Sequence, residues 1–262
     1  MRLALDTNAV ATAMQSLGRD LTTCPTQLRI TMETPQNKVK NDLSYSVRRF
    51  YVDRFFIENI KLLPSGSEVL DIGGSKVNKR GLFNIADHKL EVKYLNISEK
   101  REPDILGDAA NIAVKSNSFD GAILAEVLEH VINPETVLKE AHRILKKDGV
   151  LFITTPFLVQ VHGDPDDYLR YTASWYKQTL TTIGFEVQLI ERQGGFFSVL
   201  TNLLKNYFNQ RPINSGWLNF SLRLVLKTLG GQFLDLDKKA DGKGGTLLNG
   251  CATGYGIICL KK

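Results

Sequence analysis

The sequence predicts an α/β fold built on a parallel sheet, and three observations carry this prediction. Short apolar segments rich in strand-forming residues alternate with helical patterns between residues 69 and 157. Several of these segments end at a turn with an acidic residue or a glycine, and the clearest turn holds Asp71, Gly73 and Gly74. The spacing is that of right-handed βαβ units. Because the carboxyl ends of parallel strands meet at one edge of a sheet, we expect the ligand-binding residues there.

Seven strands are expected along the chain. Each is a short apolar run or an apolar–polar alternation, bounded by residues such as Gly, Pro, Asp or Asn that favour turns. The strand near residue 104 is the weakest, and the one that starts at residue 150 is the richest in β-forming residues. The strands are expected at residues 69–72, 91–97, 104–106, 120–125, 150–155, 185–190 and 254–260.

Three helices are expected around these strands, at residues 43–63, 134–145 and 175–183. The first has apolar residues at helical spacing and ends where Pro64 opens a turn. Pro134 starts the second, and residues 146–149, which end in Gly149, close it. Gly184 ends the third.

Two further parts of the chain flank this core of residues 43–193. Residues 1–42 are polar and rich in Thr, and we expect a loosely packed arm. Residues 194–250 form an insertion before the last strand, residues 251–262. Apolar residues recur at helical spacing over residues 196–208, and a second such stripe surrounds Trp217 and Phe220. The insertion is either a helical cap over the acceptor pocket or a surface that contacts a membrane.

Composition and charge narrow the class of protein. The chain of 262 residues has 43% hydrophobic and 23% charged residues, which is ordinary for a globular protein. No apolar stretch reaches the roughly 18 residues of a membrane span, and Asp6 and Asn8 interrupt any signal sequence. The three cysteines lack CxxC spacing, so we expect a cytoplasmic protein without disulfides or a metal centre. Residues 194–262 hold nine Lys or Arg and three Asp, so the excess positive charge lies there.

Three predicted strand ends carry side chains suited to a nucleotide-like cofactor. Gly73 and Gly74 allow the backbone to approach a ligand closely after Asp71. Asn96 ends the second strand, where an acidic residue usually binds ribose hydroxyls. Asp108 follows the third strand, where its carboxylate can accept a hydrogen bond from an adenine amino group.

These turns together resemble a known family. The segments are Val69-Leu70-Asp71-Ile72-Gly73-Gly74, Gly107-Asp108-Ala109, Phe119-Asp120, Glu126-Val127-Leu128-Glu129-His130-Val131 and Arg143-Ile144-Leu145-Lys146-Lys147-Asp148-Gly149. In this order they resemble the class I S-adenosylmethionine-dependent methyltransferases, and most closely their small-molecule "type 11" branch. The resemblance implies a Rossmann-like seven-stranded sheet with helices on both faces and an antiparallel last strand beside the fifth. The sequence departs from the family pattern at Ser75 and Val77, where glycines are common, and at Asn96, where an acidic residue is usual.

The resemblance also implies roles for individual residues. The cofactor is S-adenosyl-L-methionine, and its methionine end would be lined by Asp71, Gly73 and Gly74. Asn96 would face the ribose, Asp108 and Ala109 the adenine, and Glu126 the transferred methyl group. The implied activity is methyl transfer (EC 2.1.1.-) to a small molecule, a glycan or a lipid-linked acceptor, with no nucleic-acid partner.

A second cluster of polar residues follows the fifth strand, over residues 161–172. His162 is the candidate catalytic base, because an oxygen acceptor must lose its proton and a histidine titrates near neutral pH. The candidate substrate-binding residues are His130, Asp167, Tyr168, Arg170 and Tyr171. Two alternatives stay open. Arg170 either binds an acidic substrate group or forms a salt bridge with an Asp of its own loop, and Glu129 with His130 either takes part in catalysis or only starts a helix.

Further alternatives concern the first helix and the activity itself. Tyr51 either covers the cofactor or packs in the core, and Arg48, Arg49 and Arg54 either line the site or form a solvated face. A nucleotide-dependent oxidoreductase on a similar sheet requires a Gly-x-Gly-x-x-Gly turn, which residues 73–78 do not supply. A non-catalytic module with the same fold is the remaining alternative.

Overall fold

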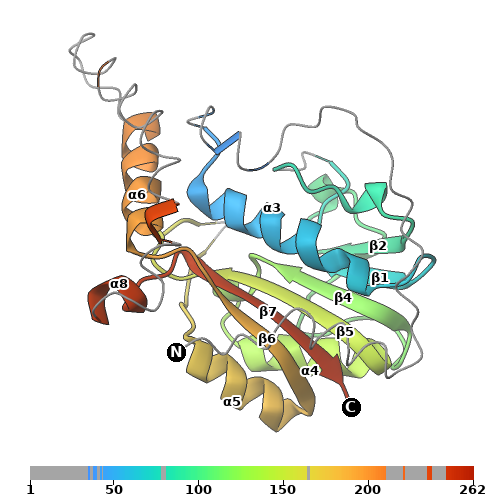
Figure 1. Cartoon of the computed structure of the whole chain (residues 1–262). Coiled ribbons are helices and arrows are strands. Elements are labelled where there is room, and N and C mark those ends of the chain that lie inside the picture. The colour runs from blue at the N-terminus through green and yellow to red at the C-terminus, as the bar shows by residue number, and fades with distance from the viewer. Residues whose placement is uncertain are drawn as a thin grey trace.

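The computed structural model describes residues 35, 38–39, 42, 44–77, 81–163, 166–210, 221, 235–237 and 246–262. Its centre is a sheet of seven strands in the order β3-β2-β1-β4-β5-β7-β6 (Figure 1). The first five strands in the chain are parallel, whereas β7 runs antiparallel to both β5 and β6. The predicted α/β fold and the antiparallel last strand beside the fifth are therefore confirmed.

The observed strands match all seven predicted segments. The sheet comprises β1 (Glu68–Ile72), β2 (Glu91–Asn96), β3 (Ile105–Leu106), β4 (Phe119–Ala125), β5 (Leu145–Pro156), β6 (Phe185–Gln193) and β7 (Gly254–Lys261). The order reverses direction between β1 and β4, since β1 pairs with β2 on one side and with β4 on the other. Such a switch point opens a crevice at the carboxyl ends of the strands.

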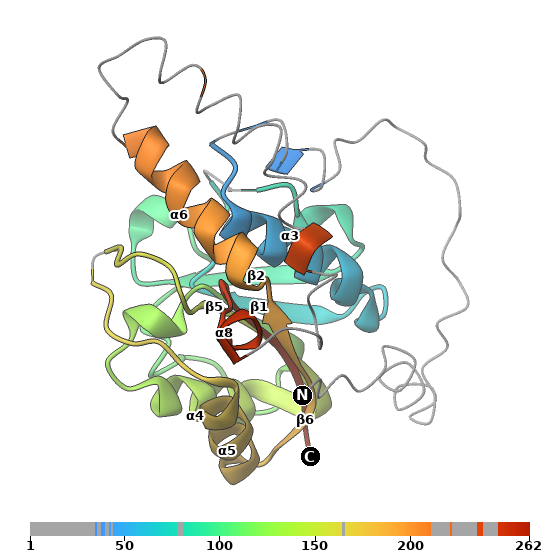
Figure 2. The ribbon, with the colours of Figure 1, turned by 60° about the vertical axis from the view of Figure 1, so that its left-hand side comes forward.

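Helices cover both faces of the sheet, as Figures 1 and 2 show. On one face, α3 (Val47–Asn59) packs Phe55, Phe56 and its neighbours against β1, β4, β5 and β7. On the other face, α4 (Pro134–Ile144) and α5 (Ala173–Ile183) bury a second cluster that includes Leu138 and Tyr176. The sheet thus has two separate apolar cores, because alternate residues of each strand face opposite sides.

The remaining helices are short or belong to the insertion. The 3-10 turns are η1 (Ile60–Leu62), η2 (Ile85–Asp87), η3 (Glu99–Arg101) and η4 (Leu128–His130), and the insertion contributes α6 (Phe196–Gln210) and α8 (Thr246–Gly250). In both views α6 lies beside α3 (Figures 1 and 2). Between β1 and β2 the described residues contain no α-helix, only η2. The turn after β1 therefore relies on side chains, and not on a following helix, for its shape.

Two boundaries differ from the sequence predictions. The helix that starts at Pro134 ends at Ile144, and Leu145 already pairs with Phe119 of β4. The register then shifts between Phe119 and Gly121, and Asp148 has a φ of 60°. Residues 145–149 therefore form the irregular start of β5: Leu145 pairs with Phe119, residues 146–149 bulge out of the ladder, and pairing resumes at Val150 opposite Gly121. Similarly, α3 begins at Val47, where Ser46 caps it by accepting from the N–H of Arg49.

Several predictions fall on parts of the chain that are not described. These are the arm, except for positions 35, 38–39 and 42, and the second apolar stripe around Trp217 and Phe220. Within the described part of the chain, no helix has the length and apolar character needed to cross a membrane.

Candidate functional site

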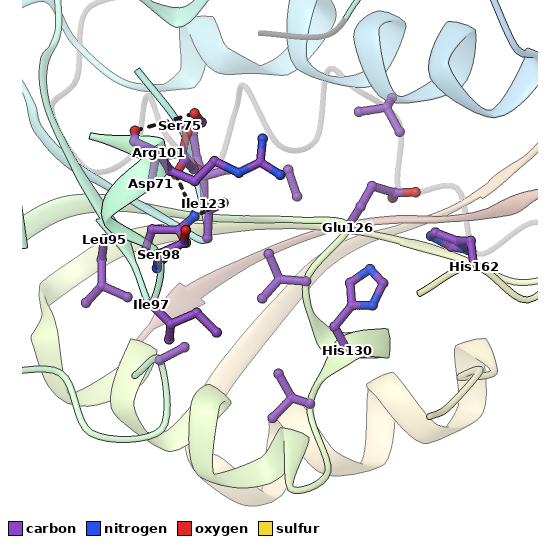
Figure 3. A pocket seen from close by; sticks show the side chains of 18 of the residues that line it. Asp71, Ser75, Leu95, Ile97, Ser98, Arg101, Ile123, Glu126, His130 and His162 are labelled. Atoms are coloured by element: carbon purple, nitrogen blue, oxygen red, sulfur yellow. Dashed lines mark hydrogen bonds between the residues drawn. The ribbon is translucent and has the colours of Figure 1, made fainter. Parts of the chain in front are cut away.

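A cavity of about 1500 Å³ opens at the carboxyl ends of β1, β2 and β4. Figure 3 shows Asp71 and Ser75 on one side of it and Glu126, His130 and His162 on the other. All seven candidate cofactor-binding residues line this cavity, namely Asp71, Gly73, Gly74, Asn96, Asp108, Ala109 and Glu126. The candidates His130, His162 and Tyr168 line it as well. The structure therefore brings the two polar clusters of the sequence into one cavity.

The turn after β1 requires both of its glycines. Gly73 has a φ of 83°, and a Cβ there would lie 2.6 Å from a methyl carbon of Val127. A Cβ on Gly74 would lie 2.3 Å from an oxygen of the Asp71 carboxylate, which folds back over the turn. The N–H of Gly73 donates to the Leu95 carbonyl at 2.8 Å and ties the turn to β2. Close approach of backbone and carboxylate is the reason for glycine at both positions.

Asn96 holds this turn in place. Its Nδ2 donates to the carbonyls of Gly73 and Gly74, both at 3.0 Å, and its Oδ1 accepts from the N–H of Ser98 at 3.0 Å. A carboxylate at this position cannot donate these two bonds. Ser75 adds a further brace, because its hydroxyl donates to the Val77 carbonyl at 2.6 Å. Ser75 and Asn96, two of the three residues that depart from the family pattern, therefore stabilise the turn.

Asp108 and Ala109 form the far end of the cavity after β3. The Asp108 carboxylate accepts from the N–H of Ala110 at 2.8 Å and its carbonyl accepts from the N–H of Asn111 at 3.0 Å. Asp108 is exposed, whereas Ala109 is only 9% exposed and packs into the core. One oxygen of Asp108 thus shapes the turn, and the other remains available to a ligand.

Glu126 forms a buried ion pair with Arg48 of α3. The guanidinium donates through Nε to one carboxylate oxygen at 2.9 Å and through Nη2 to the other at 2.5 Å. Burial acts to raise the pKa of Glu126, but Arg48 outweighs it and holds the pKa below its usual value. Glu126 has a φ of 56°, and its N–H donates to the Thr154 carbonyl at 2.8 Å. The end of β4 is therefore fixed by a charged residue from 78 positions earlier in the chain.

Arg48 connects this carboxylate to the insertion. Its Nη1 donates to the side-chain oxygen of Gln193, and its backbone N–H donates to the Asn202 side chain of α6 at 3.2 Å. Arg48 is 6% exposed. Of the two alternatives for the arginines, lining of the site holds for Arg48 and Arg49, since both line the cavity. The signal in the sequence is an Arg placed among Val47, Phe50 and other buried residues of the helix.

Glu129 is a second buried carboxylate, one turn after Glu126. It is 0% exposed, and neither of its oxygens has a hydrogen-bond partner among the described residues. Burial, and then the charge of Glu126, raises the pKa of Glu129 to about 8. The sequence left open whether Glu129 takes part in catalysis or only starts a helix, and the structure places it in the 3-10 turn η4 beside the cavity.

His130 and His162 come from different elements and meet edge to face, with ring centroids 5.2 Å apart. Nδ1 of His130 lies 2.5 Å from the Asp166 carbonyl, so it carries the proton and donates. Nδ1 of His162 lies 3.3 Å from the Gln160 carbonyl and 3.4 Å from an Asp167 oxygen. Each imidazole therefore has Nδ1 directed at an oxygen, which leaves Nε2 as its accepting atom.

The other candidate residues brace residues 166–172, the part of the loop that packs on η4. Arg170 donates two hydrogen bonds to the Asp167 carboxylate, one of them at 2.7 Å. These bonds hold the pKa of Asp167 at about 2. The Tyr171 hydroxyl donates to the Leu128 carbonyl at 2.8 Å, and burial raises the pKa of that hydroxyl. The cavity lining does not include Asp167, Arg170 or Tyr171. The salt-bridge alternative for Arg170 therefore describes the loop, and Tyr168 alone of these four residues lines the cavity.

Tyr51 packs in the core and does not line the cavity. Its hydroxyl is 2.9 Å from the Ser198 hydroxyl of α6, and the Arg54 guanidinium lies 5.0 Å from the centroid of its ring. Asn202 and Asn206 of the same helix do line the cavity. The first turns of the insertion therefore form one wall of the site.

Comparisons with known proteins agree with this arrangement. A family model described as a methyltransferase domain, of type 11, matches residues 79–153. The ubiquinone biosynthesis O-methyltransferase of Pelagibacter ubique is 32% identical over 91 residues, which are 34% of this chain and 33% of the relative. The match thus spans about a third of that curated relative's length.

Solved structures match over most of the chain. A SAM-dependent methyltransferase from Archaeoglobus fulgidus superposes with a TM-score of 0.52 at 16% identity, over 81% of this chain and 94% of the other. The [4+2]-cyclase SpnF superposes with a TM-score of 0.51 at 18% identity, over 81% of this chain and 80% of the other. At these identities the likeness concerns the fold.

Proposed function

We propose that this chain is a methyltransferase of the type 11 kind on the class I fold, that it uses S-adenosylmethionine as its cofactor, and that it methylates an oxygen atom of a small-molecule, sugar or lipid-linked acceptor. The observation that carries this proposal is the shared cavity. The turns at Asp71 and Asp108 line it together with His130 and His162. A cofactor and an acceptor bound there lie side by side, as methyl transfer requires.

The cofactor roles follow from where each strand ends. We assign the methionine end of the cofactor to Asp71, Gly73 and Gly74, and the adenine to Asp108 and Ala109. Asn96 contacts the ribose through Oδ1, which keeps one free acceptor position beside the bond from Ser98. Glu126, held by Arg48, borders the sulfonium and contributes negative charge there.

The transfer is an in-line displacement with one proton to remove. The acceptor hydroxyl gives its proton to Nε2 of His162, and the oxygen attacks the methyl carbon. The carbon–sulfur bond breaks, and its electron pair stays on sulfur, which becomes a neutral thioether. His162 suits this role because its Nδ1 is directed at the Gln160 carbonyl and the Asp167 carboxylate. Tyr168 lines the same end of the cavity and contacts the acceptor.

The start of the insertion supports a role as a cap. Nζ of Lys205 donates to the carbonyls of Val39, Asp42 and Tyr45, at 2.6, 3.2 and 3.1 Å, although Lys205 is only 1% exposed. Asn206 of the same helix donates to the Gln160 side chain of the loop at 2.9 Å. We propose that α6 covers the acceptor, since it touches both the first helix and the His162 loop.

A protein that binds the cofactor without transferring its methyl group is the second candidate. Two observations favour it: the amide of Asn96 is engaged in the turn after β1, and the cyclase SpnF shares the fold. This candidate predicts cofactor binding with no labelled product from any acceptor.

The deciding experiment measures binding and transfer separately. S-adenosylhomocysteine at 1000 times its dissociation constant should stabilise the protein by about 4 kcal/mol, seen as a higher melting temperature. His162→Ala should keep this stabilisation and lose transfer of labelled methyl to a panel of hydroxyl compounds. No thermal shift at millimolar S-adenosylhomocysteine would remove the methyltransferase proposal, and full turnover in His162→Ala would remove the base.

A further inference from the structure

Three side chains that converge beside the acceptor end of the cavity point to a second kind of ligand. Glu129, His130 and His162 each present one atom able to bind a metal ion, and these atoms all lie within 4.8 Å of one another. We propose that Glu129, His130 and His162 bind a divalent transition-metal ion of the zinc type. Two imidazoles and one carboxylate are the protein ligands of many catalytic zinc sites.

The buried carboxylate is the first argument. Glu129 is 0% exposed, and both of its oxygens lack a hydrogen-bond partner among the described residues. Buried carboxylate oxygens without partners are costly, and native proteins retain them where a proton or a metal ion completes the site. One oxygen lies 3.7 Å from Nε2 of His130. Two ligands that each stand about 2.1 Å from a tetrahedral zinc ion are roughly 3.4 Å apart, so the observed spacing needs little adjustment.

The orientation of the histidines is the second, independent argument. A histidine that binds a metal through one ring nitrogen directs the other at a carboxylate or a backbone carbonyl. Both histidines have this arrangement: Nδ1 of His130 faces the Asp166 carbonyl, and Nδ1 of His162 faces the Gln160 carbonyl and the Asp167 carboxylate. Asp167 is itself held by Arg170. The second shell of a metal site is thus already built.

The donor set selects the class of ion. Glu126 is one turn away, but Arg48 engages both of its oxygens, so it does not add a second carboxylate. Magnesium and calcium prefer sites made of oxygen atoms alone, whereas two imidazoles favour zinc, cobalt or iron in the divalent state. His130 and His162 line the cavity, so the open positions of the ion face the acceptor.

The role of the ion in catalysis rests on the proposed function, although its binding does not. A hydroxyl oxygen of the acceptor occupies an open position on the ion, which lowers the pKa of that hydroxyl as it does for zinc-bound water. The proton leaves to water in the cavity, the oxygen forms its bond to the methyl carbon, and the carbon–sulfur bond breaks with its electron pair on sulfur. With the ion bound, His162 is a ligand, and loss of the proton to water replaces the proton transfer to His162 that we propose for the metal-free site. The acceptors that fit best are acidic hydroxyls, such as phenols and catechols.

The test titrates metal-free full-length protein with cobalt(II) chloride and follows the visible absorption of the bound ion. Zinc chloride then displaces the cobalt, and calorimetry gives the stoichiometry. We expect one ion per chain. Glu129→Gln, which keeps the size of the side chain, and His162→Ala should each weaken cobalt binding by at least about 100-fold. Asp167→Asn, which alters only the second shell, should weaken it by about 10-fold. His88→Ala removes a histidine outside the cluster and serves as the matched control.

Every outcome of this titration bears on the proposal. No cobalt binding, equal binding by the parent chain and by His162→Ala, or a sulfur-to-cobalt charge-transfer band would each overturn it. The band would place the ion on a cysteine. Failure of the metal-site proposal is distinguishable from failure of the methyltransferase proposal. If only the metal site is wrong, S-adenosylhomocysteine still raises the melting temperature, and methyl transfer continues in the presence of a chelator with His162 as the base.

Discussion

Arg48→Met removes the positive half of the buried ion pair at the end of β4. The substitution keeps an unbranched apolar stem of similar length, so the packing of α3 against the sheet is preserved. It leaves the Glu126 carboxylate without a hydrogen-bonded counter-charge, and the more distant Arg49 is then the positive charge that acts on it. It also removes the hydrogen bond from the guanidinium to Gln193. The change therefore isolates the electrostatic contribution of Arg48 to folding.

The structure sets the magnitude. Unit charges 2.9 Å apart, the distance from Nε of Arg48 to the carboxylate, attract by about 6 kcal/mol at an effective dielectric constant of about 20. Part of this energy offsets the desolvation of two groups whose side chains are 7% and 16% exposed. Loss of one partner of such a pair costs about 3–5 kcal/mol, and we expect the free energy of unfolding of Arg48→Met to fall by that amount at pH 7.

Chemical unfolding at a series of pH values measures this loss. The pKa of Glu126 is lowered in the folded protein, so the stability that the pair contributes is present at pH 7 and is lost as the pH falls through the folded pKa. The gap between the parent chain and Arg48→Met should therefore narrow below about pH 4. Lys146→Met, which breaks half-exposed pairs with Glu68 and Asp120, is the matched control and should cost at most about 1 kcal/mol.

A double-substitution cycle provides the refutation. Arg48→Met combined with Glu126→Gln should recover most of the loss, because no charge is then left buried. A loss below 1 kcal/mol in Arg48→Met, or a double variant no more stable than the single one, would contradict the assignment of a buried ion pair.

Three further predictions concern other parts of the molecule. Gly74→Ala places a Cβ 2.3 Å from the Asp71 carboxylate, so calorimetry should show at least about 10-fold weaker binding of S-adenosylhomocysteine, whereas Gly250→Ala, whose Cβ meets nothing within 4 Å and which does not line the cavity, should bind normally. Lys205→Met leaves three carbonyls without their donor and should lower the free energy of unfolding by about 3 kcal/mol. The control Lys139→Met, at an exposed position, should change it negligibly. Equal stabilities of the two variants would contradict the role of Lys205 in anchoring α6. The raised pKa of Glu129, about 8, means that the folded chain retains a proton that the unfolded chain has lost. In metal-free buffer the stability of the parent chain should therefore decline from about pH 4.5 to pH 8, and a decline of the same size in Glu129→Gln would show that another group is responsible.

Local sequence patterns were sufficient to predict the strands and the residues at their ends that line the cavity. Apolar runs that end in Asp71, Asn96, Asp108 and Glu126 are properties of neighbouring residues, and each of these four side chains lines the cavity. The end of the helix that starts at Pro134 could not be predicted from local patterns. Leu145 continues the helical pattern, but its pairing with Phe119 of β4 outweighs helix propensity there.

The interaction partners of the charged side chains could not be predicted from local sequence patterns. Nothing near Arg48 in the chain indicates that its carboxylate lies 78 residues away, and nothing near Glu129 shows that both of its oxygens are buried without partners. Likewise, the sequence allows Asp167 and Arg170 either to bind a substrate or to form a salt bridge with each other. Only the folded loop shows that they form the salt bridge.

The sequence by itself thus determined the α/β fold, the cofactor edge and the candidate residues, because secondary-structure periodicity and the turn residues Gly73 and Gly74 act over a few neighbouring positions. Only the tertiary structure showed which of these side chains line one cavity and which instead stabilise its walls through hydrogen bonds. It also showed that Glu129, His130 and His162 converge. The physical reason is that desolvation and charge pairing depend on contacts between distant segments, and these contacts exist only once the two faces of the sheet are packed.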